Sequence, residues 1–237
     1  MSALYVDIGN TRVKWQQRFD DRPPVQGLLE KSNVTHFYWP DVEGKVIVSS
    51  VRDDEELYRL LEQRYPGQVE WLTSPLVDYN GFKHCYPEAS RLGVDRWLAM
   101  LGARSHKEGG VVVVDAGTAL TIDVFSADNQ HEGGYIVPGL TMARDALFSG
   151  TGKVRPFVDD ERADNVELGR NTVNCVVAGT LRQHLALVAS VRADYPEYQL
   201  LVTGGDGQTL AASLNTGYYP DLIFDGMDSL CVGLYTA

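Results

Sequence analysis

The sequence predicts an α/β protein that is built from two copies of one structural unit. The first observation is a repeated phrase: residues 5–15 read YVDIGNTRVKW, and residues 111–125 read VVVVDAGTALTIDVF. Each phrase is an apolar run that ends in aspartate, passes through glycine and threonine, and becomes apolar again. The second observation is that strand and helix patterns follow each phrase in the same order. This order predicts two duplicated domains, each with a mixed β-sheet flanked by helices.

The first half is predicted to open with a β-hairpin. Residues 3–8 form a buried strand, and residues 12–19 pair back with it after a turn at Gly9-Asn10. Residues 45–51 form the next strand, and a helix follows because its apolar side chains share one face. These side chains are Leu57, Leu60, Leu61 and Tyr65. Pro66-Gly67 ends the helix, and VEWL forms another strand.

The second half repeats this order. Strands are predicted in GVVVVD, ALTIDVF and GGYIVPG, and a helix follows around residues 140–149. A longer helix near residues 172–193 carries an apolar stripe. YQLLVTGG forms a further strand, and two short helical segments close the chain. The polar segment SHKEGG marks the junction, which predicts domains at residues 1–107 and 108–237.

Composition excludes several classes of function. The chain has 237 residues, 44% of them hydrophobic, which is enough for two domains with cores of their own. Its net charge of −11 argues against nucleic acid as a partner, because binding phosphates requires a basic surface. No apolar run approaches the roughly 20 residues of a membrane span. Three dispersed cysteines and no signal-peptide pattern predict a cytoplasmic protein.

The repeated Asp-Gly-Thr turns predict a phosphate-binding function. Glycine lets the backbone approach a ligand closely, so that N–H groups and a threonine hydroxyl can contact phosphate oxygens. A strand-end aspartate such as Asp7 can hold Mg²⁺, directly or through water, because hard cations prefer oxygen ligands. Two such hairpins on opposite walls of a cleft between the domains would hold one nucleoside triphosphate.

The segment GVDRWLAMLGA, residues 93–103, predicts a helix with two functional side chains in its first turn. Its buried stripe comprises Val94, Trp97, Leu98 and Leu101. Asp95 is a candidate acceptor for a proton from a substrate hydroxyl, and Arg96 can pair with a carboxylate through its planar fork. The alternative is structural, since the helix dipole favours an acid in the first turn.

The two loops resemble those of the acetate and sugar kinase, Hsp70 and actin superfamily. In that superfamily, duplicated ribonuclease H-like domains carry paired phosphate loops, and the active site lies in the cleft between them. DIGNTRVK is similar to the first loop, DAGT to the second and LLVTGGDG to the adenosine segment. A narrower resemblance rests on DIGNTRVKW, GVDRW, DAGTALTIDV, GGYIVPGL and GRNT, which occur in the order typical of type III pantothenate kinases.

This resemblance implies transfer of the γ-phosphoryl group of ATP to the 4′-hydroxyl of pantothenate, the first step of coenzyme A biosynthesis. It implies Mg²⁺ with ATP, and a monovalent cation, K⁺ or NH₄⁺, at Asp115. Asp95 would accept the proton. The implied ATP contacts are Asp7, Ile8, Gly9, Asn10, Thr11, Arg12, Val13, Lys14 and Thr118. The implied pantothenate contacts are Tyr86, Gly93, Val94, Asp95, Arg96 and Thr172.

The resemblance also implies a homodimer with pantothenate bound close to the interface. Alternatives to this function are a kinase of the same superfamily that acts on another small hydroxyl compound, and a regulator of gene expression related to the family. Thr172 has an alternative of its own, because a threonine at the start of a helix can serve only as its N-cap. No functional role is assigned to residues 20–80.

Overall fold

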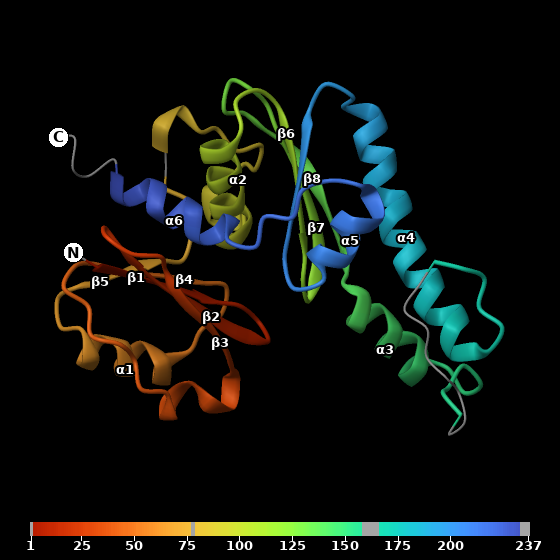
Figure 1. The fold of residues 1–237 in the computed structure, drawn as a ribbon, viewed down its shortest axis with the longest axis horizontal. Helices are drawn as coiled ribbons and strands as arrows, with labels where there is room; N and C mark the ends of the chain where they lie inside the picture. Colours follow the sequence, from red (N-terminus) through yellow and green to blue (C-terminus); the bar gives the residue numbers. More distant parts are fainter. Residues whose placement is uncertain (1, 77–78, 158–165, 233–237) are drawn as a thin grey trace. The chain divides into compact units, whose positions relative to one another are not determined.

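The computed structural model describes residues 2–76, 79–157 and 166–232. The chain forms two compact units (Figure 1). The first comprises Met1–His106 together with Asp221–Ala237, and the second comprises Lys107–Pro220. The last helix of the chain therefore belongs to the first unit, whereas the predicted second domain runs to residue 237.

The first unit is built on a five-stranded sheet in the order β3-β2-β1-β4-β5. Its strands are β1 (Ser2–Ile8), β2 (Arg12–Phe19), β3 (Val25–Glu30), β4 (Val46–Ser50) and β5 (Val69–Leu72). The first three strands form an antiparallel meander, while β4 runs parallel to β1 and β5 parallel to β4. The predicted hairpin is confirmed, but β3 and the 3₁₀-helix Lys31–His36 after it were not predicted.

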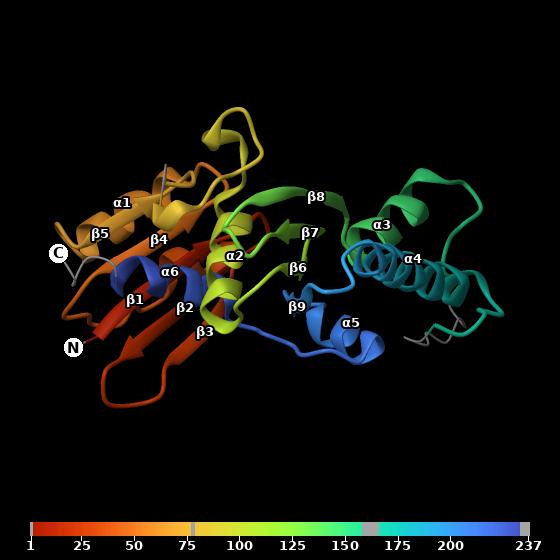
Figure 2. The ribbon, with the colours of Figure 1, turned by 90° about the horizontal axis from the view of Figure 1, so that it is seen from above.

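Helices cover both faces of this sheet (Figure 1). On one face α1 (Glu55–Arg64) begins at Asp54, whose side chain accepts a hydrogen bond from the backbone N–H of Leu57 at 3.2 Å. Leu57 and Leu61 of α1 join the apolar core of that face. On the other face lie α2 (Val94–His106) and α6 (Leu222–Val232), which pack side by side (Figures 1 and 2).

The second unit has a four-stranded sheet in the order β8-β7-β6-β9. Its strands are β6 (Val111–Ala116), β7 (Ala119–Phe125), β8 (His131–Pro138) and β9 (Gln199–Thr203). Its helices are α3 (Leu140–Gly150), α4 (Thr172–Asp194) and α5 (Gly207–Leu214). Leu181 and Val188 of α4 and Leu210 of α5 pack into the core of this sheet.

Four strands of the first sheet have the same topology as the four strands of the second, which confirms the predicted duplication, and β5 is an addition to the first sheet. In each, an antiparallel meander of three strands is extended by a strand that runs parallel to the first. Asp7 in β1 and Asp115 in β6 occupy the same place, near the end of the first strand of each sheet. The repeated phrase of the sequence is therefore repeated in the structure.

The placement of α6 has a local cause. Gly102 of α2 and Gly226 of α6 lie where a Cβ atom would overlap the backbone of the other helix. Two glycines facing each other allow these helices to approach closely, so α6 packs with the first unit although it follows the second in sequence. Among the described helices, none combines the length and the hydropathy needed to cross a bilayer. Cys85 and Cys175 are exposed and are not part of a disulfide, and the side chain of Cys231 lies outside those described.

Candidate functional site

Asp7 is the centre of a polar group in the first unit. It lies on β1, with Lys14 opposite it on β2 and Ser49 opposite it on β4. Successive strand residues face opposite sides of a sheet, so Asp7 and Ser49 face the side that α2 covers, away from the α1 core that holds Val6 and Val48. The Ser49 hydroxyl donates a hydrogen bond of 2.8 Å to Asp7 Oδ1.

Asp7 interacts electrostatically with Asp95, the candidate proton acceptor. Asp7 is only 7% exposed, and burial raises the pKa of its carboxyl. The positive charge of Lys14 and the hydrogen bond from Ser49 lower this pKa, and the charge of Asp95 raises it. The structure therefore brings the predicted residues Asp7, Lys14 and Asp95 into one electrostatic group.

The turn between β1 and β2 holds the remaining residues of the first predicted loop. Gly9 donates its backbone N–H to the carbonyl of Arg12 at 3.1 Å, and Asn10, Thr11 and Arg12 are exposed. Arg52 donates a hydrogen bond of 2.9 Å to the carbonyl of Asn10. Arg52 was not predicted, and it fixes the turn from the segment that follows β4. Ile8 and Val13 flank this turn and are buried in the core on the α1 side of the sheet, which anchors both ends of the loop.

Asp95 lies in the first turn of α2, as predicted. Its Oδ1 accepts a hydrogen bond of 2.8 Å from the backbone N–H of Arg96. A Cβ atom on Gly93 would lie 2.6 Å from the same oxygen. Glycine at residue 93 therefore leaves the space in which the Asp95 carboxylate lies, while the buried Val94 anchors the start of the helix.

Arg96 and Tyr86 form a pair beside Asp95. Arg96 is 7% exposed and donates a hydrogen bond of 2.9 Å to the Tyr86 hydroxyl. Its guanidinium carbon also lies 5.8 Å from the centre of the Tyr86 ring. The backbone carbonyl of Tyr86 lies 2.8 Å from His84 Nδ1. The two predicted substrate contacts are thus held together, and Arg96 follows Asp95 directly in α2.

In the second unit, two glycines lie against the second loop, which contains Asp115 and Thr118. Gly204 has a φ of +92°, and a Cβ atom there would overlap the Asp115 carboxylate and the carbonyl of Ala116. Gly139 donates its backbone N–H to the carbonyl of Thr118 at 3.0 Å. A Cβ atom on Gly139 would overlap the carbonyl oxygens of Gly117 and Thr118. Gly139 and Gly204 were not assigned to the site. The motifs GGYIVPGL and VTGG contain them, but only the folded chain shows that both lie against the second loop.

His184 supports this second loop from α4. It is 2% exposed, and its Nε2 lies 2.9 Å from the carbonyl of Pro138, the residue before Gly139. Burial lowers the pKa of the imidazole, the effect being partly offset by the bond to Pro138 and the charge of Asp206. Because a carbonyl oxygen can only accept, His184 Nε2 carries the proton of this hydrogen bond, which holds the end of β8 in place.

Thr172 is the first residue of α4 and is half-buried. The helix is capped by Asn171, whose side chain accepts a hydrogen bond of 2.7 Å from the N–H of Asn174. The interpretation of Thr172 as the N-cap is therefore wrong, because the preceding residue has the extended backbone and the side-chain acceptor that a cap requires. Its hydroxyl is not needed for that cap.

The oxygen atoms of both loops fit cations. The buried carboxylate of Asp7, with Oδ1 held by Ser49, has the hard oxygen chemistry that Mg²⁺ prefers. Asp115 offers a second carboxylate beside closely packed backbone. Within the described ranges, no three His, Cys, Asp or Glu side chains gather into a metal site formed by protein alone.

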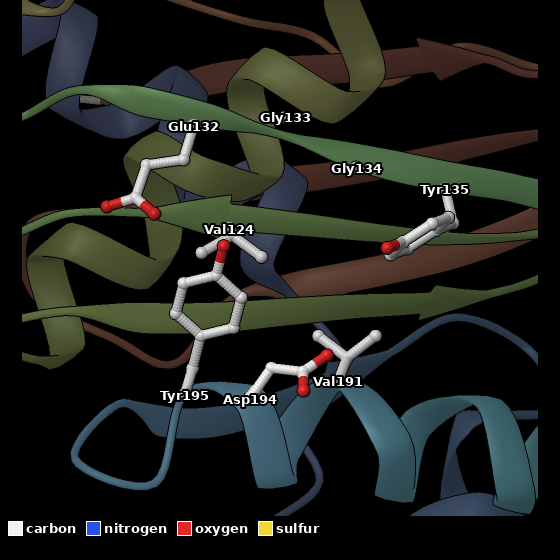
Figure 3. Close-up of a pocket in the computed structure, with 8 residues that line it drawn as sticks. All are labelled: Val124, Glu132, Gly133, Gly134, Tyr135, Val191, Asp194 and Tyr195. Atoms are coloured by element: carbon white, nitrogen blue, oxygen red, sulfur yellow. The ribbon is translucent and has the colours of Figure 1, made fainter.

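A separate cavity of about 180 Å³ lies in the second unit, where β7 and β8 meet the end of α4 (Figure 3). Glu132 of β8 and Asp194 of α4 face it together with Tyr135 and Tyr195. Glu132 also accepts a hydrogen bond of 2.8 Å from the Tyr198 hydroxyl. None of the predicted site residues lines this cavity, so it is distinct from the two loops.

Solved structures support the fold. A protein described as a Baf family transcriptional activator, from Campylobacter jejuni, has a TM-score of 0.65 at 24% identity, over 99% of this chain and 100% of that chain. A protein described as a 2-dehydro-3-deoxygalactonokinase, from Sinorhizobium meliloti, has a TM-score of 0.57 at 12% identity, over 99% of this chain and 100% of that chain. Both identities are below 25%, so these likenesses concern the fold alone.

Sequence comparisons identify the family. A protein named type III pantothenate kinase from Alcanivorax borkumensis is 34% identical, over 95% of this chain and 96% of the relative. The protein of the same name from Acinetobacter baumannii is 34% identical over 96% of each chain. A family model described as type III pantothenate kinase matches residues 3–194. The alternative that the protein regulates gene expression is not favoured, because the family model and these relatives are all named type III pantothenate kinase. The chain belongs to the type III pantothenate kinase family.

Proposed function

We propose that Asp95 accepts the proton of the pantothenate 4′-hydroxyl during ATP-dependent phosphorylation, the activity that follows from family membership. A bond forms between that oxygen and the γ-phosphorus, the bond from the γ-phosphorus to ADP breaks, and the proton passes to the carboxylate. The assignment rests on the position of Asp95 at the start of α2, where its charge acts on Asp7. General-base catalysis typically contributes about 10²–10⁴-fold to the rate.

The nucleotide is proposed to contact one loop of each unit. Residues 7–14 contribute exposed backbone at the turn and the positive charge of Lys14, and Thr118 contributes a hydroxyl from the second loop. Mg²⁺ held at Asp7 would neutralise part of the phosphate charge. Phosphoryl transfer requires mainly positioning and charge stabilisation from the protein, which these groups are suited to supply.

Pantothenate is proposed to bind through its carboxylate and hydroxyl groups. The Arg96 guanidinium matches a carboxylate, and its hydrogen bond to Tyr86 holds it in place. Gly93 and Val94 set the position of Asp95 relative to this anchor. The hydroxyl of Thr172 is proposed to complete the substrate contacts, which agrees with its not serving as the helix cap.

A monovalent cation, K⁺ or NH₄⁺, is proposed to bind at Asp115. The chain carries a net charge of −11 and its two substrates are anions, so a second cation would reduce the repulsion at the site. The supporting observation is that Gly204 and Gly139 bring backbone close to Asp115 and Thr118. Large monovalent cations are bound well by such carboxylate and carbonyl oxygens.

The protein is further proposed to act as a cytoplasmic homodimer. The edge strand β8 exposes Tyr135 at 52% and Ile136 at 61%, and α3 after it exposes Met142 and Leu147. Apolar side chains on an unpaired edge and the adjoining helix are suited to burial against a second copy. Sedimentation should give twice the monomer mass of 26.2 kDa, and a monomer at assay concentration would contradict the proposal.

A coupled assay of ADP release with ATP and pantothenate tests the catalytic assignment. Asp95→Asn keeps the shape of the side chain, and it should lower kcat by about 10²–10⁴-fold with nucleotide affinity kept. Asp53→Asn, at an exposed position before α1, is the matched control and should retain full activity. Full turnover of Asp95→Asn would remove Asp95 from the mechanism.

Replacing K⁺ with Na⁺ should raise the KM for ATP, and an unchanged KM would contradict the proposed monovalent cation site at Asp115.

A further inference from the structure

Ser49 lies next to Asp7 on the neighbouring parallel strand. It is 1% exposed, and its hydroxyl donates a hydrogen bond of 2.8 Å to Asp7 Oδ1. Ser49 is not among the predicted site residues, and it lies in VIVSS, a strand without a recognised motif. A buried hydroxyl that donates its hydrogen bond to one carboxylate oxygen restricts the rotation of that carboxylate.

The second unit repeats this placement. In the first unit the register pairs Asp7 with Ser49, and in the second it pairs Asp115 with Thr203. Thr203 is 2% exposed. Both units therefore place a buried residue with a hydroxyl opposite the next-to-last residue of the first strand, an aspartate, on the strand that runs parallel to it. Most other buried positions of β4 and β9 are aliphatic, so a hydroxyl there is not required by the core.

We propose that Ser49 is a positioning residue: its hydroxyl holds Asp7 Oδ1, so that the second carboxylate oxygen is presented to the cation that accompanies the nucleotide. This inference rests on the proposed role of Asp7 at that cation. The hydrogen bond of 2.8 Å fixes one of the two carboxylate oxygens, so Ser49 helps to keep the buried carboxylate oriented.

The adjacent residue provides a matched control. Ser50 is 9% exposed and, as the next residue of the strand, faces the opposite side of the sheet. Its hydroxyl donates to the carbonyl of Arg52 at 2.6 Å. Ser50→Ala therefore removes a hydroxyl from the same strand without touching Asp7. Ser49→Thr is the conservative variant, since β9 carries threonine at the corresponding position.

The test measures ADP binding by calorimetry, with and without Mg²⁺, so that its readout does not depend on turnover. In the wild type, Mg²⁺ should strengthen ADP binding. Ser49→Ala should reduce this strengthening about tenfold, as expected for the loss of one hydrogen bond to a charged group. Ser49→Thr should keep the strengthening of ADP binding by Mg²⁺ close to the wild-type value, and Ser50→Ala should leave this strengthening unchanged. Urea unfolding of each variant verifies that the first unit is folded.

A double variant separates the inference from its premise. If Ser49 acts through Asp7, then Ser49→Ala should have no further effect on Mg²⁺-dependent binding in an Asp7→Asn background. An Asp7→Asn variant with normal Mg²⁺ dependence would overturn the assignment of Asp7 and this inference with it. A strong effect of Asp7→Asn combined with wild-type behaviour of Ser49→Ala would overturn the inference alone.

Discussion

Gly102 of α2 and Gly226 of α6 bring the two helices into backbone contact. A Cβ atom on Gly102 would overlap the carbonyl oxygen of Leu222 and lie 3.1 Å from the backbone nitrogen of Gly226. A Cβ atom on Gly226 would in turn overlap the carbonyl oxygen of Leu98. Because α2 carries Asp95 in its first turn, this contact links the end of the chain to the position of the proposed base.

We predict that Gly102→Ala and Gly226→Ala each destabilise the first unit by about 1–3 kcal/mol, the usual cost of overpacking. The added methyl group meets rigid backbone, so the helices must separate, and activity should fall with stability. Gly179→Ala is the matched control, since this exposed glycine of α4 has nothing within 4 Å of a built Cβ atom. It should be neutral or stabilising by up to about 1 kcal/mol. Urea unfolding measures the stability of each variant, and equal stability of all three would contradict a close backbone contact between α2 and α6.

Local patterns predict most of the fold but not this contact. The hairpins and long helices follow from apolar periodicity and turn residues, whereas the approach of Gly102 to Gly226 depends on residues far apart in the sequence. Strand β3 was missed for another reason. It is an edge strand whose Val25 and Leu28 are each 50% exposed, so its composition lacks the apolar run of a buried strand.

The candidate site shows the same division. Asp7 and Asp95 were predicted from motifs in separate segments, and the structure brings them together. Ser49 could not be chosen from the sequence, because its role depends on the register between β1 and β4. Gly204 was visible as a glycine, but its function depends on a φ of +92° against the Asp115 carboxylate. Sequence patterns thus predict residue types, while strand register decides which of them meet.

Asp7→Asn should increase the stability of the protein while it lowers activity. Burial raises the pKa of the Asp7 carboxyl from 3.8, so the native state keeps this proton to a higher pH than the unfolded state does. Stability is therefore lost as the pH rises through the native pKa, by about 1.4 kcal/mol for each unit of the shift. Asparagine removes this loss and can still accept the Ser49 hydrogen bond. Unfolding at pH 7.5 measures the gain, and a variant less stable than the wild type would contradict the prediction.

His184 should make the second unit sensitive to acid. Burial lowers the pKa of its imidazole below the unfolded value of 6.5, so the unfolded chain binds the proton more readily than the native chain. Stability from the neutral imidazole is therefore fully present above about pH 6.5 and is lost as the pH falls toward the native pKa. His184→Gln keeps a donor for the Pro138 carbonyl but does not titrate. Denaturant unfolding between pH 8 and pH 5 should show a flatter profile for this variant, and identical profiles would rule out His184 as the cause.

Tyr86→Phe should weaken pantothenate binding more than it slows phosphoryl transfer. The change removes the hydroxyl that accepts the 2.9 Å hydrogen bond from Arg96 but keeps the ring near the guanidinium. The guanidinium then loses a fixed partner, and its fork is less well placed for the pantothenate carboxylate, so the KM for pantothenate should rise about tenfold. Tyr79→Phe is the matched control, because the Tyr79 hydroxyl donates at 2.6 Å to the carbonyl of Ser229 in α6. That variant should lower stability and leave this KM unchanged. A Tyr86→Phe enzyme in which kcat collapses at constant KM would instead place the Tyr86 hydroxyl in the chemical step.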